Sequence, residues 1–362
     1  MRLELTHGPL DARRLQAIAG LYGEFNRKYR DADFCRRLFD ENPCGAALHA
    51  FALDGGGEIV GHYAVVPLDV VRDGRRRRAG KGEAFVVRAD RRMETISVDG
   101  GAPIAIGLAM PLQLYRHALE QGLELVHMIA GPEVGLIHRL TGCREVAVRQ
   151  PRAGLALRPF APPPPGRSAW RRAAQTALAT GQACASALAR AATFPGLGAT
   201  RCVSGAGLDA AWLARIVADL PAGDGWTLAV DAPLLAWLAR TGGLELVALD
   251  DGSDDYALVC GRAGEGRVME VVLWRQRSAG LRPALRLLAA VVRRAGELDD
   301  LRVEVPLTAA ARDGERAGLR AAARLFCFQE REQAWGMYVR SADRYYLDPG
   351  HLRFTPFFYA TF

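Results

Sequence analysis

Residues 46–71 read AALHAFAL-DGGGE-IVGHYAVVPLDVV, and this stretch decides the fold. Its two apolar runs, 46–53 and 59–71, are rich in residue types that favour strands. Between them, Asp54-Gly55-Gly56-Gly57 supplies the positive φ angles that a chain reversal needs. The stretch therefore predicts a long antiparallel hairpin.

The elements after the hairpin follow from turn residues and apolar periodicity. The turn at 72–74 leads into a third strand, so this part of the chain is a meander. Apolar residues from Leu108 to Leu119 recur at four- and three-residue spacing, which places them on one face of a helix. Pro132 suits the first turn of a second helix. The predicted elements are a strand at 76–87, a helix from near Gly107, a strand at 123–130, a helix at 132–140 and a strand at 145–148.

This order of elements resembles the GCN5-related N-acetyltransferase (GNAT) fold. The resemblance implies an α/β protein with a mixed sheet that is mostly antiparallel and flanked by helices. The second half of the chain repeats the order in a weaker form, with strands at 244–249, 256–260 and 268–274, a helix from Leu281, a strand at 301–306, a helix at 309–325 and a strand at 335–339. We therefore expect two tandem GNAT-like domains, of which the second has diverged.

A proline-rich segment divides the two halves. Residues 159–166 include Pro162-Pro163-Pro164-Pro165-Gly166, which neither continues a helix nor fills a central strand. An alanine-rich helix at 169–192 follows it. The predicted organisation is an N-terminal acyltransferase domain at 1–158, a linker with a bracing helix at 159–200 and a C-terminal divergent GNAT-like domain at 201–362.

Composition limits the class of protein. Half of the 362 residues are apolar, which is enough for two cores, and the net charge of +7 comes mostly from dispersed arginines. The seven cysteines are scattered without a Cys-x-x-Cys pair, which indicates reduced thiols in a cytoplasmic protein and no metal site. The longest uncharged apolar stretch, 100–115, is too short to cross a bilayer. We therefore expect neither a membrane nor a nucleic acid as partner.

The resemblance implies a site for acyl-coenzyme A. GNAT enzymes hold its pyrophosphate on backbone amides between a strand and the start of a helix, where free N–H groups and the helix dipole favour an anion. The positions that match here are Val86, Val87, Arg88, Arg91 and Arg92 after the strand, and Ala105, Ile106, Gly107 and Leu108 at the helix start. The loop at 93–103 is longer than in the family, so a degenerate loop that binds no cofactor stays as the alternative.

The resemblance also suggests two catalytic residues. Glu83 lies in the strand where many members place the carboxylate that accepts the amine proton, although it could instead be a surface residue paired with Lys81 or Arg78. His138 lies near the place of the family's thiolate-protonating tyrosine, and an ordinary histidine pKa near 6.5 would allow donation at neutral pH. The alternative for His138 is a helix residue without a catalytic role.

Two further histidines are candidates for substrate binding. His62, in the second strand of the hairpin, would point into an acceptor cleft on one of its two possible faces. His127 lies in the middle of the strand at 123–130, where a core position is the alternative.

The sequence thus predicts an acyl-CoA-dependent N-acyltransferase that moves an acyl group, in the first instance acetyl, to the amine of a small molecule held between the domains. An acyl carrier protein could replace coenzyme A as the carrier, and the assembly is expected to be a monomer or homodimer. The loop at 275–280 near the second domain's helix offers Arg277 and Gly280, and we interpret that domain as structural or substrate-shaping. The alternatives are a non-catalytic GNAT-like scaffold and a FemX-like aminoacyl-tRNA-dependent transferase.

Overall fold

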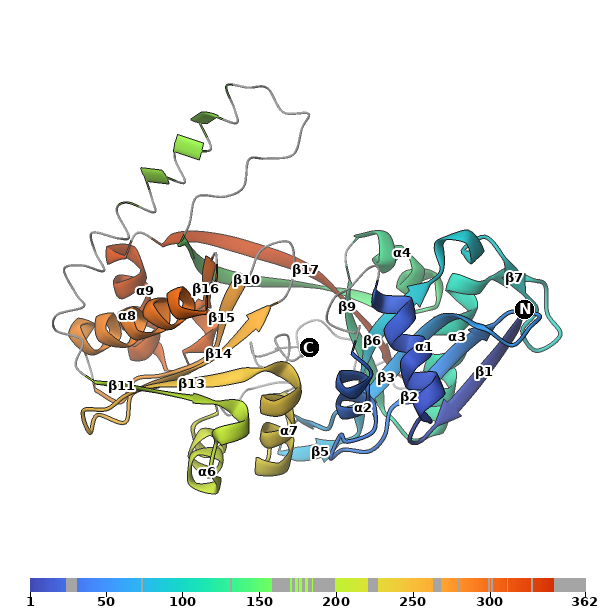
Figure 1. Cartoon of the computed structure of the whole chain (residues 1–362), viewed down its shortest axis with the longest axis horizontal. Helices are drawn as coiled ribbons and strands as arrows, with labels where there is room; N and C mark the ends of the chain where they lie inside the picture. Colours follow the sequence, from blue (N-terminus) through green and yellow to red (C-terminus); the bar gives the residue numbers. More distant parts are fainter. Residues whose placement is uncertain are drawn as a thin grey trace. The chain divides into compact units, whose positions relative to one another are not determined.

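A computed structural model gives the arrangement of the chain (Figure 1). It describes residues 1–23, 31–72, 74–130, 132–157, 199–220, 227–262, 268–278, 280–298, 300, 302–310, 312–326 and 328–341, with a few separate residues between 170 and 184. The described residues divide into two compact units. Unit 1 contains those up to Val148 together with 227–237 and 334–341, and unit 2 contains those at 149–220 and 238–333.

Unit 1 is built on a mixed sheet with the strand order β1-β2-β3-β6-β9-β17. Its strands are β1 (Arg2–His7), β2 (Leu48–Leu53), β3 (Ile59–Pro67), β6 (Ala79–Val87), β9 (Leu125–Ala130) and the end of β17 (Gln329–Ser341). Neighbouring strands are antiparallel except for β6 and β9. A small second sheet joins β4 (Val70–Arg72), β5 (Arg75–Arg77) and β12 (Thr227–Leu228).

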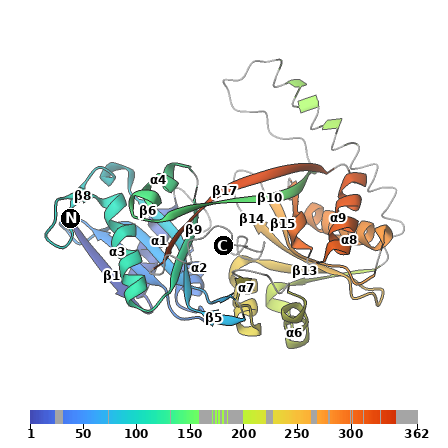
Figure 2. The ribbon, with the colours of Figure 1, turned by 180° about the vertical axis from the view of Figure 1, so that it is seen from behind.

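Helices cover both faces of this sheet (Figures 1 and 2). Alternation along β2 and β3 turns Leu48, Ala50 and Tyr63 toward α3 (Ile106–Glu120), where they form one core. The intervening residues His49 and His62 pack on the opposite face, beneath α1 (Ala12–Gly23) and α2 (Ala32–Phe39). The helix α4 (Pro132–Leu140) follows β9.

Unit 2 has its own mixed sheet, with the order β10-β16-β15-β14-β13-β11. Its helices α8 and α9 pack on one face of that sheet around a continuous apolar core. The elements are β10 (Arg144–Ala156), β11 (Thr200–Ser204), α6 (Ala210–Asp219), β13 (Leu244–Leu249), β14 (Tyr256–Arg262), β15 (Val268–Arg275), α8 (Leu281–Glu297), β16 (Arg302–Pro306) and α9 (Asp313–Leu325). The helix α7 (Ala232–Gly242) precedes β13.

The predicted α/β class and the order of elements are confirmed, but the compact units are not two contiguous halves of the chain. Pairing explains the difference, because β17 joins unit 1 through Gly336–Ser341 beside β9, and β12 pairs with β4. The predicted loop at 93–103 also differs, since β7 (Thr95–Ile96) and β8 (Ile104–Ala105) pair within it as a hairpin. The proline-rich linker, most of the helix predicted at 169–192 and the end of the chain lie outside the described residues.

The described residues were compared with the requirements for a membrane-spanning helix and for a metal site. Within the part of the chain that the structure describes, no helix is long and apolar enough to cross a membrane. The same residues contain no cluster of three or more His, Cys, Asp or Glu side chains placed to hold a metal ion. The six cysteines among them are free.

Candidate active site

The parallel pair of strands in unit 1 separates part of the way along. β6 and β9 pair through Ala79↔Leu125, Gly80↔Val126 and Lys81↔His127, and the ladder ends there although both described strands continue. Ala84 has a φ of 60°, a left-handed conformation that residues other than glycine rarely adopt. The distortion lies next to Glu83, so β6 changes direction where the ladder ends.

One face of the sheet carries the predicted carboxylate. Glu83 pairs with Lys81 at 3.0 Å between Oε2 and Nζ, and the two side chains are 10% and 6% exposed. Glu83 pairs across the sheet with Ala64, the neighbour of Tyr63, so alternation turns it away from the Tyr63 face and toward α1. Burial first, and the charge of Glu83 second, raise the pKa of Tyr22 in α1. The pairing with Lys81 is therefore present, but the pair is buried rather than on the surface.

The other face carries a chain of hydrogen bonds that the sequence did not indicate. The Tyr63 and Tyr115 hydroxyls lie 2.7 Å apart, and the Tyr115 hydroxyl is 2.7 Å from Nδ1 of His138. Tyr115 also donates to the sulfur of Met128 on β9 at 3.2 Å. A Cβ at Gly82 would overlap the Tyr63 hydroxyl, so glycine leaves room for this chain beside the end of the ladder. The distant sequence positions of the three partners explain why spacing did not reveal them.

His138 lies in a more apolar place than its position near a helix end suggested. Its ring contacts Tyr338 of β17 at a centroid distance of 5.5 Å, and its side chain is almost fully buried. This burial lowers the pKa of His138 to about 4. The expectation that His138 donates with an ordinary pKa is therefore corrected: the imidazole is neutral at neutral pH, and its Nδ1 lies beside the Tyr115 hydroxyl.

The start of α3 is the segment that the sequence predicts to bind the donor's diphosphate. Its N-cap residue, Ala105, provides no side-chain cap, and the N–H of Ile106 donates to the carbonyl of Glu94 at 3.0 Å. A Cβ placed on Gly107 would meet only the Phe85 ring, 4.0 Å away. The first amides of a helix have no partner within the helix and the space beside Gly107 is open, so anion binding at this helix start stays a prediction.

The arginines predicted to meet phosphate already have partners. Arg88 bonds to both oxygens of Asp90, at 2.9 and 2.7 Å, and to Glu58 at 3.2 Å. Arg91 pairs with Glu94 at 2.6 Å. Arg92 donates to the carbonyl of Val87 at 3.2 Å, while Val86 and Val87 are themselves buried at the end of β6. The loop's own acids and carbonyls thus hold these three cations.

The two histidines predicted to bind substrate are fully buried. His62 lies 3.0 Å from His49 between ring nitrogens and is packed against the rings of Phe39 and Tyr22. Burial, and secondarily the charge of Lys81, lower the pKa of His127 to about 3. His127 matches the core alternative given for it, and His62 takes the face of β3 that α1 and α2 cover. A substrate would reach either ring only if the surrounding elements moved.

Unit 2 differs at the corresponding strands. β15 and β16 pair in parallel from Val268↔Arg302 to Glu270↔Glu304, and Trp274 then bridges to Ala310 farther on. The guanidinium of Arg152 is buried between the two glutamates, 2.7 Å from Glu270 and 3.0 Å from Glu304. In unit 2, the buried ion pairs of Arg152 and a second bridge therefore lie where the corresponding strands of unit 1, β6 and β9, separate.

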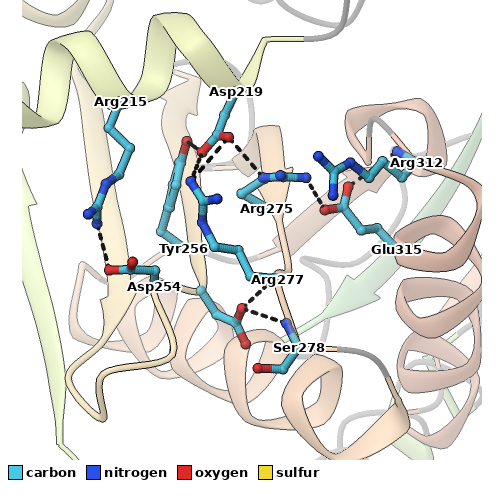
Figure 3. Close-up of polar contacts among 10 residues, drawn as sticks. Arg215, Asp219, Asp254, Tyr256, Arg275, Arg277, Ser278, Arg312 and Glu315 are labelled. Atoms are coloured by element: carbon cyan, nitrogen blue, oxygen red, sulfur yellow. Dashed lines mark hydrogen bonds and ion pairs between the residues drawn. The ribbon is translucent and has the colours of Figure 1, made fainter.

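The connection from β15 to α8 is also held from within. The fully buried carboxylate of Asp255 accepts from the N–H of Arg277 at 2.6 Å and more weakly from that of Ser278. Figure 3 shows the Arg277 and Arg275 side chains directed at Asp219, and Arg275 also reaches Glu315. Pro283 in the first turn of α8 has no N–H to offer.

Solved structures resemble the chain over most of its length. A conserved Enterococcus faecalis protein of unknown function, described as a probable N-acyltransferase, has a TM-score of 0.51 and 9% identity, with 94% of this chain and 72% of that one covered. A GCN5-related N-acetyltransferase from Kribbella flavida follows at a TM-score of 0.49, 15% identity and coverages of 93% and 70%. For Eis1 from Mycobacterium abscessus the values are 0.47, 14%, 94% and 74%.

These likenesses concern the fold. The scan against protein-family models and the search of curated proteins gave no match. The mixed α/β fold predicted from the order of elements is confirmed, and the E. faecalis protein described as a probable N-acyltransferase shares it.

Proposed function

We propose that the protein is an acyl-CoA-dependent N-acyltransferase whose donor site lies in unit 1 and whose acceptor is the amine of a small molecule. The observation that carries the proposal is the end of the β6–β9 ladder at Lys81↔His127, with a buried carboxylate on one face and a chain of hydroxyls on the other. Acyl transfer needs a proton acceptor on the amine side and a donor on the thiol side. The two faces provide one of each.

The residues then have the following roles. Glu83 accepts the proton that the acceptor ammonium loses, and the free amine attacks the thioester carbonyl. The thiolate that leaves is stabilised by hydrogen bonding from the Tyr63–Tyr115–His138 chain, in which both tyrosines stay protonated because burial raises their pKa. The thiolate takes up the second proton that the attacking nitrogen loses, so the products are the amide and the free thiol. The amides of Gly107 and Leu108 bind the donor's diphosphate.

The experiment is a thiol-release assay with acetyl-CoA and a panel of primary amines, with products identified by mass spectrometry. We expect thiol release to depend on the presence of an amine, and we expect mass spectrometry to detect an acylated product of the matching mass. Binding of acetyl-CoA without turnover of any amine would move the assignment to a non-catalytic GNAT-like binding protein. The observation that favours this second candidate is that Arg88, Arg91 and Arg92 are paired within the protein rather than directed at a phosphate.

A further inference from the structure

Lysine is rare in this chain, and one of its two lysines is buried. Lys28 and Lys81 are the only lysines among 47 lysine and arginine residues. Arginine suits pairing with a carboxylate better, because its planar fork binds two oxygens at once and is more weakly hydrated. A compact ammonium at the buried Lys81 position, in a chain that otherwise uses arginine, indicates a specific requirement there.

The surroundings of Lys81 connect that requirement with the acceptor. Lys81 forms the last pair of the β6–β9 ladder, and its ammonium lies 3.0 Å from the Glu83 carboxylate. The two residues are separated by one position on β6, so alternation turns them to the same face, toward α1. The charge of Lys81 also helps lower the pKa of His127 across the ladder, which keeps that ring neutral.

An acceptor ammonium that donates to Glu83 must approach the carboxylate within hydrogen-bond distance, and therefore comes within a few ångströms of Lys81. Two like charges at that separation repel, and the repulsion is stronger in a buried place than in water. An anionic group next to the amine removes the repulsion, since it pairs with the Lys81 ammonium while the amine meets Glu83. The ion pair is thus complementary to a zwitterion.

We propose that Lys81 determines acceptor specificity by binding a carboxylate adjacent to the reacting amine, so that the acceptor class is amino acids with the carboxylate one or two carbon atoms from the nitrogen. The inference rests on the proposed N-acyltransferase function and names the substrate class of the same site. Its distinguishing feature is discrimination between a carboxylate and its neutral amide, which a lysine that only supports the fold would not affect.

The test compares each of a panel of α- and β-amino acids with its own amide in the thiol-release assay. The wild-type protein should show kcat/KM at least about tenfold higher for the carboxylate members, the effect of one charge-assisted contact. In Lys81→Met this preference should fall to near unity through KM of the carboxylate members, and Lys81→Arg should keep part of it. Arg75→Met, a change at an exposed cation on β5, should leave the preference intact.

Calorimetry separates the possible failures. If acetyl-CoA does not bind the wild type, the proposed function itself fails. If acetyl-CoA binds but the amides react as well as the amino acids, or no amino acid reacts, or Lys81→Met keeps the preference, the proposal about Lys81 is overturned. If Lys81→Met is folded but inactive, the preference is measured instead as the ratio of the Kd values of amide and amino acid for the CoA-saturated protein. An equal ratio in the variant and the wild type would overturn the proposal about Lys81.

Discussion

The two units each begin a helix after a parallel strand, but different groups surround the two helix starts. In unit 1, α3 starts at an uncapped Ala105 with open space beside Gly107. In unit 2, the residues before α8 are held by Asp255, and Pro283 removes an amide from its first turn. A shared fold therefore does not imply a shared site, because one local carboxylate can occupy the place of a ligand's anion.

The strand ladders show the same contrast. In unit 1, β6 continues past the Lys81↔His127 pair with Gly82, which lies beside the Tyr63 hydroxyl, and Glu83. After Glu270↔Glu304 in unit 2, Arg152 and a further bridge link the strands. We infer that chemistry belongs to unit 1 and that the matching region of unit 2 is structural. The following predictions test this contrast, from the largest expected effect to the smallest.

Glu83→Gln and Glu270→Gln should differ in kind. Removing the base should lower kcat by about 10²-fold or more, with little change in acetyl-CoA affinity. Glu270→Gln leaves Arg152 with one fewer anionic partner in a buried place, so it should lower stability and leave kcat of the folded protein unchanged. Steady-state kinetics with thermal unfolding checks both. Equal losses of kcat in the two variants would remove the contrast.

Acid should unfold unit 1 before unit 2. All histidines that the structure describes are in unit 1, and burial lowers the pKa of His49 and His127 from 6.5 to about 3. The unfolded chain takes up protons below pH 6.5 while the folded rings stay neutral, so this stability is complete above pH 6.5 and is lost as the pH falls toward about 3. Each ring contributes a loss of about 2 kcal/mol at pH 5.

Hydrogen exchange at pH 7 and pH 5, resolved by segment, measures this difference. The amides of β2, β3 and β9 should lose protection at the lower pH, and those of β13 to β16 should change less. Equal loss in both units would show that the buried rings do not determine the acid response.

Asp255→Ala should lower the stability of unit 2 by about 1–3 kcal/mol, because it removes a buried acceptor from the N–H groups of Arg277 and Ser278. Burial raises the pKa of Asp255 in the folded protein above its value in the unfolded chain. The folded protein therefore loses stability as the pH rises through that pKa and Asp255 ionises. Asp255→Asn should therefore cost less than Asp255→Ala. Urea unfolding measures both, and a change in acetyl-CoA affinity in either variant would contradict the separation of the units' roles.

Tyr115→Phe should have the smallest effect, a decrease in kcat of about tenfold, because it removes the hydroxyl that joins Tyr63 to His138. Tyr256→Phe is the matched change in unit 2, where the hydroxyl donates to Asp219 at 2.9 Å. That variant should keep the wild-type kcat. An unchanged kcat in Tyr115→Phe would show that the chain supports packing only.

The order of elements could be predicted from the sequence because glycine turns and apolar periodicity are local signals. The strands after Ile59 and the helix at Pro132–Leu140 are examples. The sequence could not predict which segments belong to unit 1, since the pairing of β17 with β9 joins residues about 200 positions apart. The family resemblance pointed to Glu83 and Gly107, but it did not reveal the tyrosine chain or the burial that makes His138 neutral.

The arginines illustrate a second limit. A cluster at Arg88, Arg91 and Arg92 predicts phosphate binding when only the cations are counted. The acids within hydrogen-bond reach of it, Asp90 and Glu94, are recognised as its partners once the 3₁₀ turn at Ala89–Arg91 and the β7–β8 hairpin are known. The sequence alone therefore did not show that these arginines are already paired within the protein.

The measurement that tests the central claim most directly is calorimetric titration of acetyl-CoA into the wild type, Gly107→Trp and Arg282→Trp. Each substitution places an indole at the second residue of its helix, α3 in unit 1 or the exposed start of α8 in unit 2. The account predicts one equivalent bound per chain, lost in Gly107→Trp and retained in Arg282→Trp. Binding that survives Gly107→Trp, or is lost in Arg282→Trp, would contradict it.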